Sequence, residues 1–393
     1  MSASPSGARL AAVALLLGNV VTGLSIIGPA GMLADLAAGL SVSIRDAGLL
    51  VTYGAVVLCL GSPLMAWAVS AMPRRPLVTI VMALLSAGLL ISAAAPNYGA
   101  VMGLRIATLI VGVVFTPMAA STIAMMVPEG DRSRAISFVF LGWALALAAG
   151  LPLITFVAVH FGWRAVYAML GAIGMATTGL LFLAVPGKLR GQPLSLASWG
   201  AIARDGYICW LLFITVLWTC GQFVLFPFVG PLLSRLASGG PETVGASFAA
   251  MGIMGFAGNA VTSRAVQRFG AWRMSLVCSA SMFLGTLLWA VGAGLLPAMI
   301  GGVMLWGFGF AALNSMQQAR LVAAAPALSG ATVALNTSAN YVGQAIGSAV
   351  GGEMFSRDLL VAMGYVGTVF MLGAFIAVYV SRRGAPGEIS TPL

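Results

Sequence analysis

Long apolar runs alternate with short polar turns along the whole chain. A helix needs about 20 apolar residues to cross the hydrocarbon core of a bilayer, and twelve runs of about this length can be placed between turns that contain charges, Pro or Gly. We therefore predict an all-α membrane protein with twelve transmembrane helices. The predicted spans are approximately 10–34, 46–69, 76–95, 98–127, 134–160, 163–185, 207–236, 243–266, 272–291, 295–325, 328–355 and 359–380.

The basic residues in the turns support this threading. If the N-terminus is cytoplasmic, 14 of the 19 Lys and Arg residues fall on the cytoplasmic side and only four on the outer side. Cytoplasmic loops of membrane proteins carry such an excess, so we predict a multi-pass protein of the inner membrane with both termini in the cytoplasm. The cytoplasmic set is Arg9, Arg74, Arg75, Arg132, Arg134, Lys188, Arg190, Arg204, Arg264, Arg268, Arg273, Arg320, Arg382 and Arg383, and the outer set is Arg45, Arg164, Arg235 and Arg357.

Composition agrees with a lipid environment. Charged residues make up 7% of the chain, against about 25% in soluble domains. The net charge of +10 comes from sparse basic residues between apolar runs, which is not the clustered pattern of a nucleic-acid-binding surface. The four cysteines lie in apolar runs without C-x-x-C spacing and are interpreted as small apolar residues.

We find no nucleotide-binding loop, metal cluster or catalytic triad in the sequence, so we expect no cofactor, no metal and no enzymatic activity. An intramembrane enzyme or a sensor on the same scaffold is the alternative from another class. It would need paired acid and base groups or an attached soluble domain, and the longest segment outside the predicted spans is about 20 residues, too short to fold alone.

The longest interruption divides the spans into six and six. We predict an N-terminal half (1–185), a central cytoplasmic linker (186–205) and a C-terminal half (206–393) that ends in a short tail. Weak self-similarity at an offset near 200 residues supports two pseudo-symmetric halves: Gly142 and Gly150 in span five correspond to Gly343 and Gly351 in span eleven. Transporters are often built from two such halves with a site near the midplane.

Arg105 is the one charged residue placed well inside a predicted span. An Arg at the centre of a membrane helix costs about 2.5 to 3.5 kcal/mol on insertion scales, so we expect it to face a cavity, a partner or a ligand. The alternative is that its side chain extends to the outer interface, because it lies about seven residues from the end of its span.

Span eleven carries two stripes at helical spacing. Gly343, Gly347 and Gly351 would let a neighbouring helix approach closely, and beside them amides recur as Asn336, Asn340 and Gln344. The amides either line a substrate cavity or serve only as hydrogen bonds between helices. With Arg105, the further residues predicted to line the cavity are Asn19, Thr22, Tyr53, Thr116, Trp218, Gln222, Asn314 and Gln317. Such a lining suits a small, uncharged or weakly charged organic molecule.

Several segments together resemble the major facilitator superfamily, and within it the 12-span drug:proton antiporter branch that includes arabinose-efflux-type permeases. They are GSPLMAWAVSAMPRRPL after span two, LRIATLIVGVVFTP in span four, GWALALAAGLP and FGWR in and after span five, and ALNTSANYVGQAIGSAVGG in span eleven. The resemblance covers nearly the whole chain. It implies a secondary transporter that works by alternating access and exports a drug or a sugar-like metabolite in exchange for protons. We expect the protein to be a monomer.

The resemblance also implies roles for particular residues. Gly142, Gly150 and Pro152 match the exporters' signature, Arg105 matches an Arg involved in coupling or substrate binding, and Arg74, Arg75, Arg264 and Arg268 stand where the family places its inner gate. The four gate residues fit equally well as plain topology determinants.

The expected acidic residue of span one is missing, since 19–27 contains no carboxylate, and Ser70 stands where the family's loop signature carries Asp. Asp35 and Asp46 are the candidate coupling residues that remain near the ends of the first spans. The alternative function is uptake or uniport of a neutral solute without protons.

Overall fold

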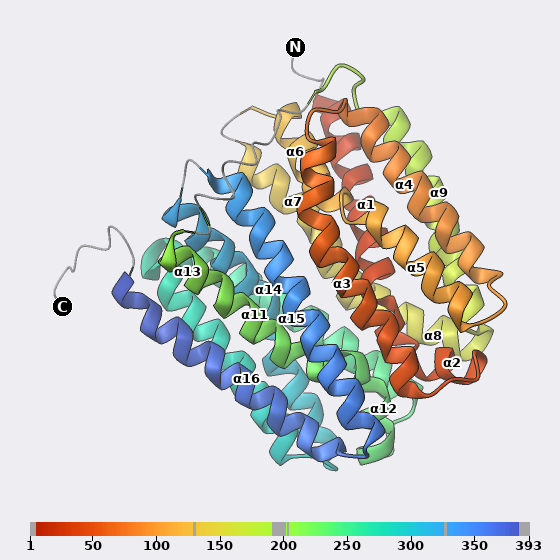
Figure 1. The fold of residues 1–393 in the computed structure, drawn as a ribbon. Helices are drawn as coiled ribbons and strands as arrows, with labels where there is room; N and C mark the ends of the chain where they lie inside the picture. Colours follow the sequence, from red (N-terminus) through yellow and green to blue (C-terminus); the bar gives the residue numbers. More distant parts are fainter. Residues whose placement is uncertain (1–4, 129–130, 191–201, 203, 326–327, 385–393) are drawn as a thin grey trace.

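The computed structural model describes residues 5–128, 131–190, 202, 204–325 and 328–384, which form helices joined by short connections (Figure 1). The first six predicted spans form one group of helices, coloured red to yellow-green in Figure 1. Its elements are α1 (Pro5–Gly31), α2 (Leu33–Gly39), α3 (Ile44–Val69), α4 (Arg74–Ala93), α5 (Tyr98–Gly112), α6 (Phe115–Met126), α7 (Arg132–Leu145), the π-helical turn η2 (Ala146–Gly150), α8 (Leu151–Phe161) and α9 (Trp163–Ala184).

The last six predicted spans form a second group, coloured green to blue in Figure 1. Its elements are α11 (Gly206–Leu225), the 3-10 turn η3 (Phe226–Phe228), α12 (Val229–Ala237), α13 (Pro241–Val291), α14 (Leu296–Ala324), α15 (Ser329–Ser356), α16 (Leu360–Val380) and η5 (Ser381–Gly384). Most of the predicted linker, at 191–201 and 203, and the end of the tail, at 385–393, lie outside the described residues.

The predicted spans match these helices, with local breaks that the apolar pattern does not reveal. Spans eight and nine run together as α13, and the chain turns between them at Gly270 with φ of 78° and ψ of 159°. Only glycine adopts this conformation without strain, so Gly270 marks the boundary. Span four is divided into α5 and α6, and span five contains the π-helical turn η2. Such turns inside helices are frequent at functional sites.

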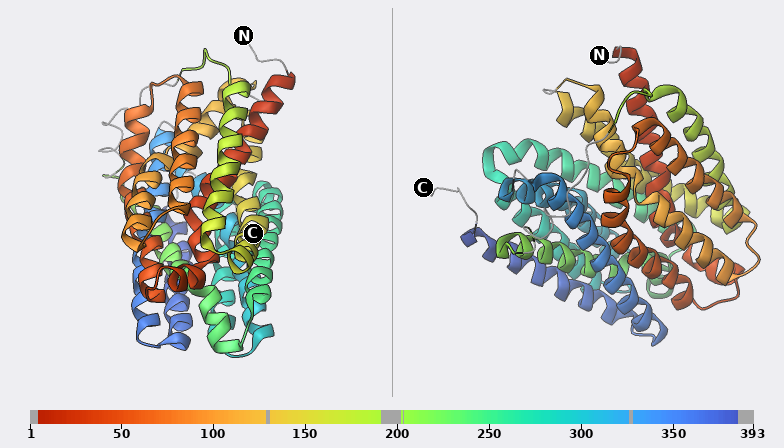
Figure 2. Two further views of the ribbon diagram at one scale, coloured as in Figure 1. Left: turned by 90° about the vertical axis from the view of Figure 1, so that its right-hand side faces the viewer. Right: turned by 45° about the horizontal axis from the view of Figure 1, so that its top comes forward.

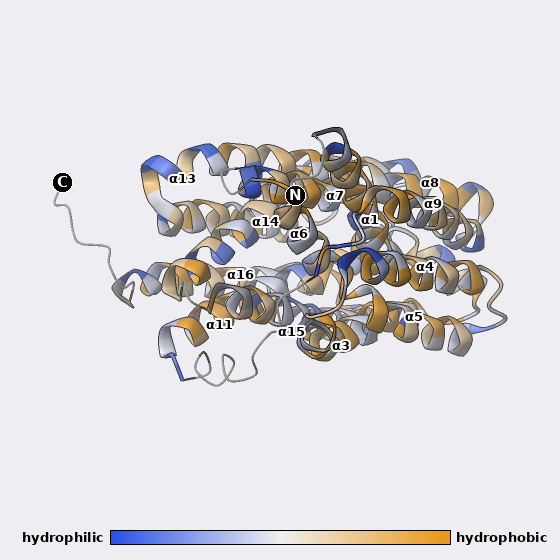
Figure 3. Ribbon diagram, turned by 90° about the horizontal axis from the view of Figure 1, so that it is seen from above, coloured by the Kyte–Doolittle hydropathy of each residue, from blue (hydrophilic) through white to orange (hydrophobic). Residues whose placement is uncertain are grey.

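Ten helical segments of the described chain are long and apolar enough to cross a membrane. One of them is the 51-residue α13, which contains two predicted spans, and α15 is the remaining span. In Figure 3, hydrophobic residues run along much of the helices, with hydrophilic stretches mainly at helix ends and connections. This distribution is the one a bilayer requires.

The two groups of helices meet at the end of the molecule that carries α2 and α12, opposite the N-terminus; we call it the far end (Figures 1 and 2). There α3 packs along α15, Arg45 forms an ion pair with Glu353 at 2.9 Å, and the hydroxyls of Thr52 and Ser348 lie 2.9 Å apart. The structure is closed at this end.

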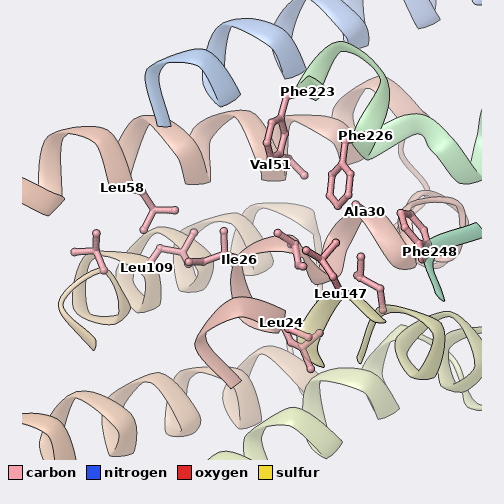
Figure 4. Close-up of a cluster of buried hydrophobic side chains, with 14 of the residues drawn as sticks. Leu24, Ile26, Ala30, Val51, Leu58, Leu109, Leu147, Phe223, Phe226 and Phe248 are labelled. Carbon is pink, nitrogen blue, oxygen red and sulfur yellow. The ribbon is translucent and has the colours of Figure 1, made fainter. Parts of the chain in front are cut away.

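Close backbone approach and an apolar cluster complete this contact. A Cβ atom added to Gly252 of α13 would lie 2.2 Å from the Cα of Ala148 in η2. In Figure 4, side chains from α1, α3, α5 and η2 lie together with Phe223, Phe226 and Phe248 of the second group. The rings of Phe226 and Phe248 are 5.8 Å apart, and both residues are buried. The cluster therefore joins the two halves.

Candidate functional site

Asn19 links three helices of the N-terminal half. Its amide nitrogen donates to the carbonyl of Val139 in α7 at 3.0 Å, and its amide oxygen accepts from the hydroxyl of Thr116 in α6 at 2.9 Å. The indole nitrogen of Trp143 donates to the same hydroxyl at 3.4 Å. We call Asn19, Thr116 and Trp143 the N-half network. The structure thus brings two predicted residues together and adds Trp143, which the sequence indicated only as a letter of the GWALALAAGLP motif.

A second network joins α11, α14 and α15 in the C-terminal half. Thr215 donates to the amide oxygen of Asn336 at 2.7 Å, and Thr219 donates to that of Asn340 at 3.1 Å. The amide nitrogens of Asn336 and Asn340 both donate to the amide oxygen of Asn314, at 3.3 and 3.4 Å. These five residues are the C-half network. Asn336 and Asn340 of the amide stripe therefore face two neighbouring helices. Of their partners on α11, Thr219 stands beside Trp218 in the predicted span seven, and Thr215 was not identified from the sequence.

In the C-half network the amide nitrogen of Asn314 has no acceptor among the described residues. The amide oxygen of Asn314 accepts two hydrogen bonds, while its amide nitrogen donates none within the described part of the chain. Asn314 and Asn340 remain partly exposed. These two amides form hydrogen bonds between helices, and because they are still accessible they can also contact a small molecule.

Gln222 is fully buried in α11, and neither its amide oxygen nor its amide nitrogen has a hydrogen-bond partner. Trp218, one turn earlier on the same face, is also buried with an unpaired indole nitrogen, and its ring meets that of Phe310 at 6.2 Å. The hydroxyl of Thr22 in α1 is likewise buried and unpaired. An unpaired buried amide or hydroxyl costs about 1 to 3 kcal/mol on the evidence of protein mutations, so these groups are binding candidates.

Arg105 lies between α1, α3 and α5, and it is only 5% exposed. Its Nε donates to the carbonyl of Leu50 at 2.6 Å, and its two terminal nitrogens donate to the carbonyls of Ser25 and Ile26, each at 2.8 Å. The alternative of a side chain extended to the outer interface is therefore wrong, because the guanidinium is enclosed by three helices. Its contacts are backbone carbonyls and not residues of either network, and a contact with substrate stays a prediction.

Tyr53 and Gln317 are the other residues predicted to line the cavity, and within the described chain neither bonds directly to a side chain of the two networks. Tyr53 is half-exposed on α3. Gln317 is buried; its amide nitrogen donates to the carbonyl of Leu211, and its amide oxygen accepts from Arg320 at 3.4 Å. Gln317 thus holds α14 against α11 and has no unpaired amide atom.

The coupling candidates Asp35 and Asp46 lie at the far end. Asp35 is part of the short α2, where burial raises the pKa of its carboxyl. The carboxylate of Asp46 accepts from the Ser43 hydroxyl at 2.7 Å, while that hydroxyl accepts from the backbone nitrogen of Asp46. This reciprocal pair caps the start of α3, which gives Asp46 a structural explanation.

The glycine stripe of span eleven packs directly on α11. Cβ atoms added to Gly343, Gly347 and Gly351 would lie 2.6, 2.3 and 2.3 Å from carbonyl oxygens of α11. In span five, a Cβ on Gly142 would lie 2.5 Å from the carbonyl of Leu16, and one on Gly150 would meet Leu24 at 2.5 Å. Pro152 follows directly in α8. Close helix packing explains these positions.

The four predicted gate arginines occupy different environments. Arg74 is buried and donates to the sulfur of Met118 at 2.6 Å, and the guanidinium of Arg75 lies over the ring of Phe182 at 4.2 Å. Arg264 and Arg268 are exposed. These positions, on the side of the molecule away from the far end, agree with a gate and equally with a topology determinant.

Known proteins match this chain over nearly its whole length. The family model described as Major Facilitator Superfamily matches residues 15–348. The chain is 27% identical over 383 residues to the inner membrane transport protein YdhP of Escherichia coli (strain K12), covering 96% of this chain and 97% of that protein. It is 24% identical over 349 residues to a protein of Haemophilus influenzae (strain PittGG) named "Probable sugar efflux transporter", covering 88% of each.

Solved structures share the fold at low sequence identity. The human organic anion transporter MFSD10 (TETRAN) superposes with a TM-score of 0.74 at 15% identity, covering 96% of this chain and 100% of that one. The D-xylose-proton symporter superposes with a TM-score of 0.71 at 16% identity, covering 92% of this chain and 97% of that one. The all-α fold with two six-helix halves, predicted from the apolar pattern, is thus confirmed.

Proposed function

Because the chain belongs to the major facilitator superfamily, we propose that it exports a small, largely uncharged organic molecule, a drug or a sugar-like metabolite, across the inner membrane by alternating access. Its relatives include an inner membrane transport protein and proteins named as probable sugar efflux transporters. These names support export and an inner-membrane location, and they agree with transport rather than catalysis.

The observation that carries the substrate class is the neutral chemistry of the two networks. Amides, hydroxyls and the indole of Trp143 make up the N-half and C-half networks, and Gln222 adds a buried donor and a buried acceptor. A molecule with hydroxyl or amide groups can pair with both atoms of Gln222. A multiply charged molecule would lose its hydration without an opposite charge beside it.

A ligand-stabilisation screen on the purified protein tests this proposal. Neutral sugars such as lactose and xylose, an organic anion such as fluorescein and an organic cation such as tetraphenylphosphonium serve as probes. We expect a neutral probe to raise the melting temperature of the intact protein, and to raise it less for Asn340→Ala. Stabilisation by the charged probes alone would contradict the proposed substrate class.

The coupling ion is a separate question. Family resemblance favours exchange for protons, with Arg105, Asp35 and Asp46 as the candidate residues. The second candidate function, uptake or uniport of a neutral solute without protons, is favoured by a specific observation. Each carboxylate of the described residues lies at a helix end, in a connection or in the short α2, and His160 lies at the end of α8. Transport into everted vesicles separates the two. If export is coupled to protons, a protonophore should abolish accumulation of the substrate in the vesicles; if it is not, accumulation should survive the protonophore.

We also propose the domain organisation and orientation that the sequence predicts. Residues 1–185 and 206–393 form the moving halves of a monomer, 186–205 connect them, and both termini lie in the cytoplasm. Labelling of cysteines introduced near the two termini, with a reagent that does not cross the membrane, tests the orientation. Labelling of either terminus from the outside in intact cells would refute it.

A further inference from the structure

Pro29 leaves one carbonyl of α1 without its helical donor. Pro29 lies inside α1, and because proline has no N–H, the carbonyl of Ser25, four residues earlier, cannot receive the usual helical hydrogen bond. Inside a bilayer such a carbonyl must be satisfied by another part of the protein. Nη1 of Arg105 donates to this oxygen at 2.8 Å, and Nη2 donates to the carbonyl of Ile26 at 2.8 Å.

The same guanidinium holds α3. Nε of Arg105 donates to the carbonyl of Leu50 at 2.6 Å. A Cβ atom on Gly54, one turn along α3, would lie 3.2 Å from both Nε and Nη2 and 2.9 Å from the Cδ1 of Leu109. Glycine at this position therefore leaves room for the guanidinium to lie flat against α3.

The charge of Arg105 is balanced by carbonyl dipoles. No ion pair involves Arg105 within the described residues, and its three nitrogen atoms all donate to backbone oxygens of α1 and α3. The planar fork of arginine can reach several oxygens in fixed directions, whereas the ammonium group of lysine is a compact point charge. The site thus requires the shape of arginine and not only its charge.

We propose that Arg105 is a positioning residue that holds the Pro29 segment of α1 against α3 and α5. It acts on transport through the shape of α1, and this role replaces the substrate contact or proton coupling that the family resemblance implies for Arg105. The segment that it holds lies between two functional parts of α1. Thr22 is one turn before Ser25, and Ala30 lies in the apolar cluster that joins the two halves at the far end. This inference rests on the proposed transport function.

Distance measurements test the positioning role without any substrate. Spin labels at Ala34 and Ala94, two exposed positions after α1 and α4, report where α1 ends relative to its own half. We expect Arg105→Gln and Arg105→Lys to broaden or shift this distance distribution. The matched control is Arg320→Gln, because Arg320 is also a buried arginine but bonds to Gln317 and Ser381; it should leave the distribution unchanged. An unchanged distribution in both Arg105 variants would overturn the proposal.

Transport kinetics separate positioning from direct contact. With a transported neutral sugar as the probe, Arg105→Gln and Arg105→Lys should each lower the maximal rate about tenfold and change the half-saturating concentration less than about twofold. Full rescue by lysine, a large rise in the half-saturating concentration, or a shifted pH profile would instead indicate a charge that meets substrate or proton. If the intact protein moves none of the probes, the proposed substrate class fails while the distance measurement still decides the role of Arg105.

Two further variants test the link with Pro29 and guard against misfolding. Pro29→Ala supplies an N–H to the Ser25 carbonyl, so Arg105→Gln should lower the rate less than about threefold in that background. Gly54→Ala keeps the arginine but displaces its guanidinium, and it should broaden the same distance distribution. Additive effects of the Pro29 and Arg105 substitutions, or a silent Gly54→Ala, would contradict the inference.

Discussion

Replacing Gln222 by methionine should stabilise the protein and impair transport at the same time. Gln222 is fully buried, and both its amide atoms lack partners. Methionine has a similar length and no strong hydrogen-bonding group. The substitution removes a desolvated amide, which costs about 1 to 3 kcal/mol when unpaired, so the free energy of unfolding of the ligand-free protein should rise by up to this amount. A bound molecule that pairs with the amide would lose its partner, which weakens binding about 5- to 150-fold.

Gln317→Met is the matched control, because Gln317 is equally buried but both its amide atoms are paired. It removes the hydrogen bond to the carbonyl of Leu211 and one of the two acceptors of Arg320, of which Ser381 remains, so it should lower stability by about 1 to 3 kcal/mol. Thermal unfolding without ligand and counterflow of a neutral sugar into liposomes measure the two effects. If Gln222→Met destabilises the protein as much as Gln317→Met, or transports normally, the assignment of Gln222 as an unpaired binding group is refuted.

Three further predictions concern packing, hydrogen bonding and charge. Gly347→Ala should lower stability by about 1 to 3 kcal/mol, because its Cβ would lie 2.3 Å from a carbonyl of α11. Gly373→Ala, with open space around it inside α16, should be neutral or stabilising in the same unfolding assay. Thr215→Val removes the donor to Asn336 and should cost about 0.6 to 1.7 kcal/mol in unfolding by denaturing detergent. Burial raises the pKa of Asp35, so its ionised form destabilises the fold, and the stability of the protein falls as the pH rises above about 4. Asp35→Asn should therefore raise the melting temperature at neutral pH and make the melting temperature less dependent on pH.

The spans could be predicted from the sequence because a bilayer imposes a length and an apolar composition on every crossing helix. Local backbone irregularities could not. The turn at Gly270 and the π-helical turn η2 leave the hydrophobic pattern unchanged, since each changes the backbone over a few residues. Glycine is frequent throughout this chain, so its presence alone does not distinguish a turn from close packing.

The candidate site could be predicted only in part, because the sequence shows which residues share a helix face but not which helices pack beside that face. Helical periodicity places Asn336 and Asn340 on one face, but their partners depend on which helices pack beside span eleven, and Thr215 has no distinguishing pattern of its own. The contacts of Arg105 were also hidden, because the carbonyl that it satisfies is made available by Pro29 in another helix. Pairings between distant segments are properties of the tertiary structure.

Counterflow into liposomes that contain only the purified protein tests the central claim most directly, namely that this chain moves a small uncharged molecule along a path lined by neutral polar groups. Liposomes preloaded with unlabelled lactose or xylose should accumulate the labelled sugar transiently, and the Gln222→Met protein should accumulate it more slowly. Accumulation of fluorescein or tetraphenylphosphonium, with no neutral probe moved by the intact protein, would contradict the account.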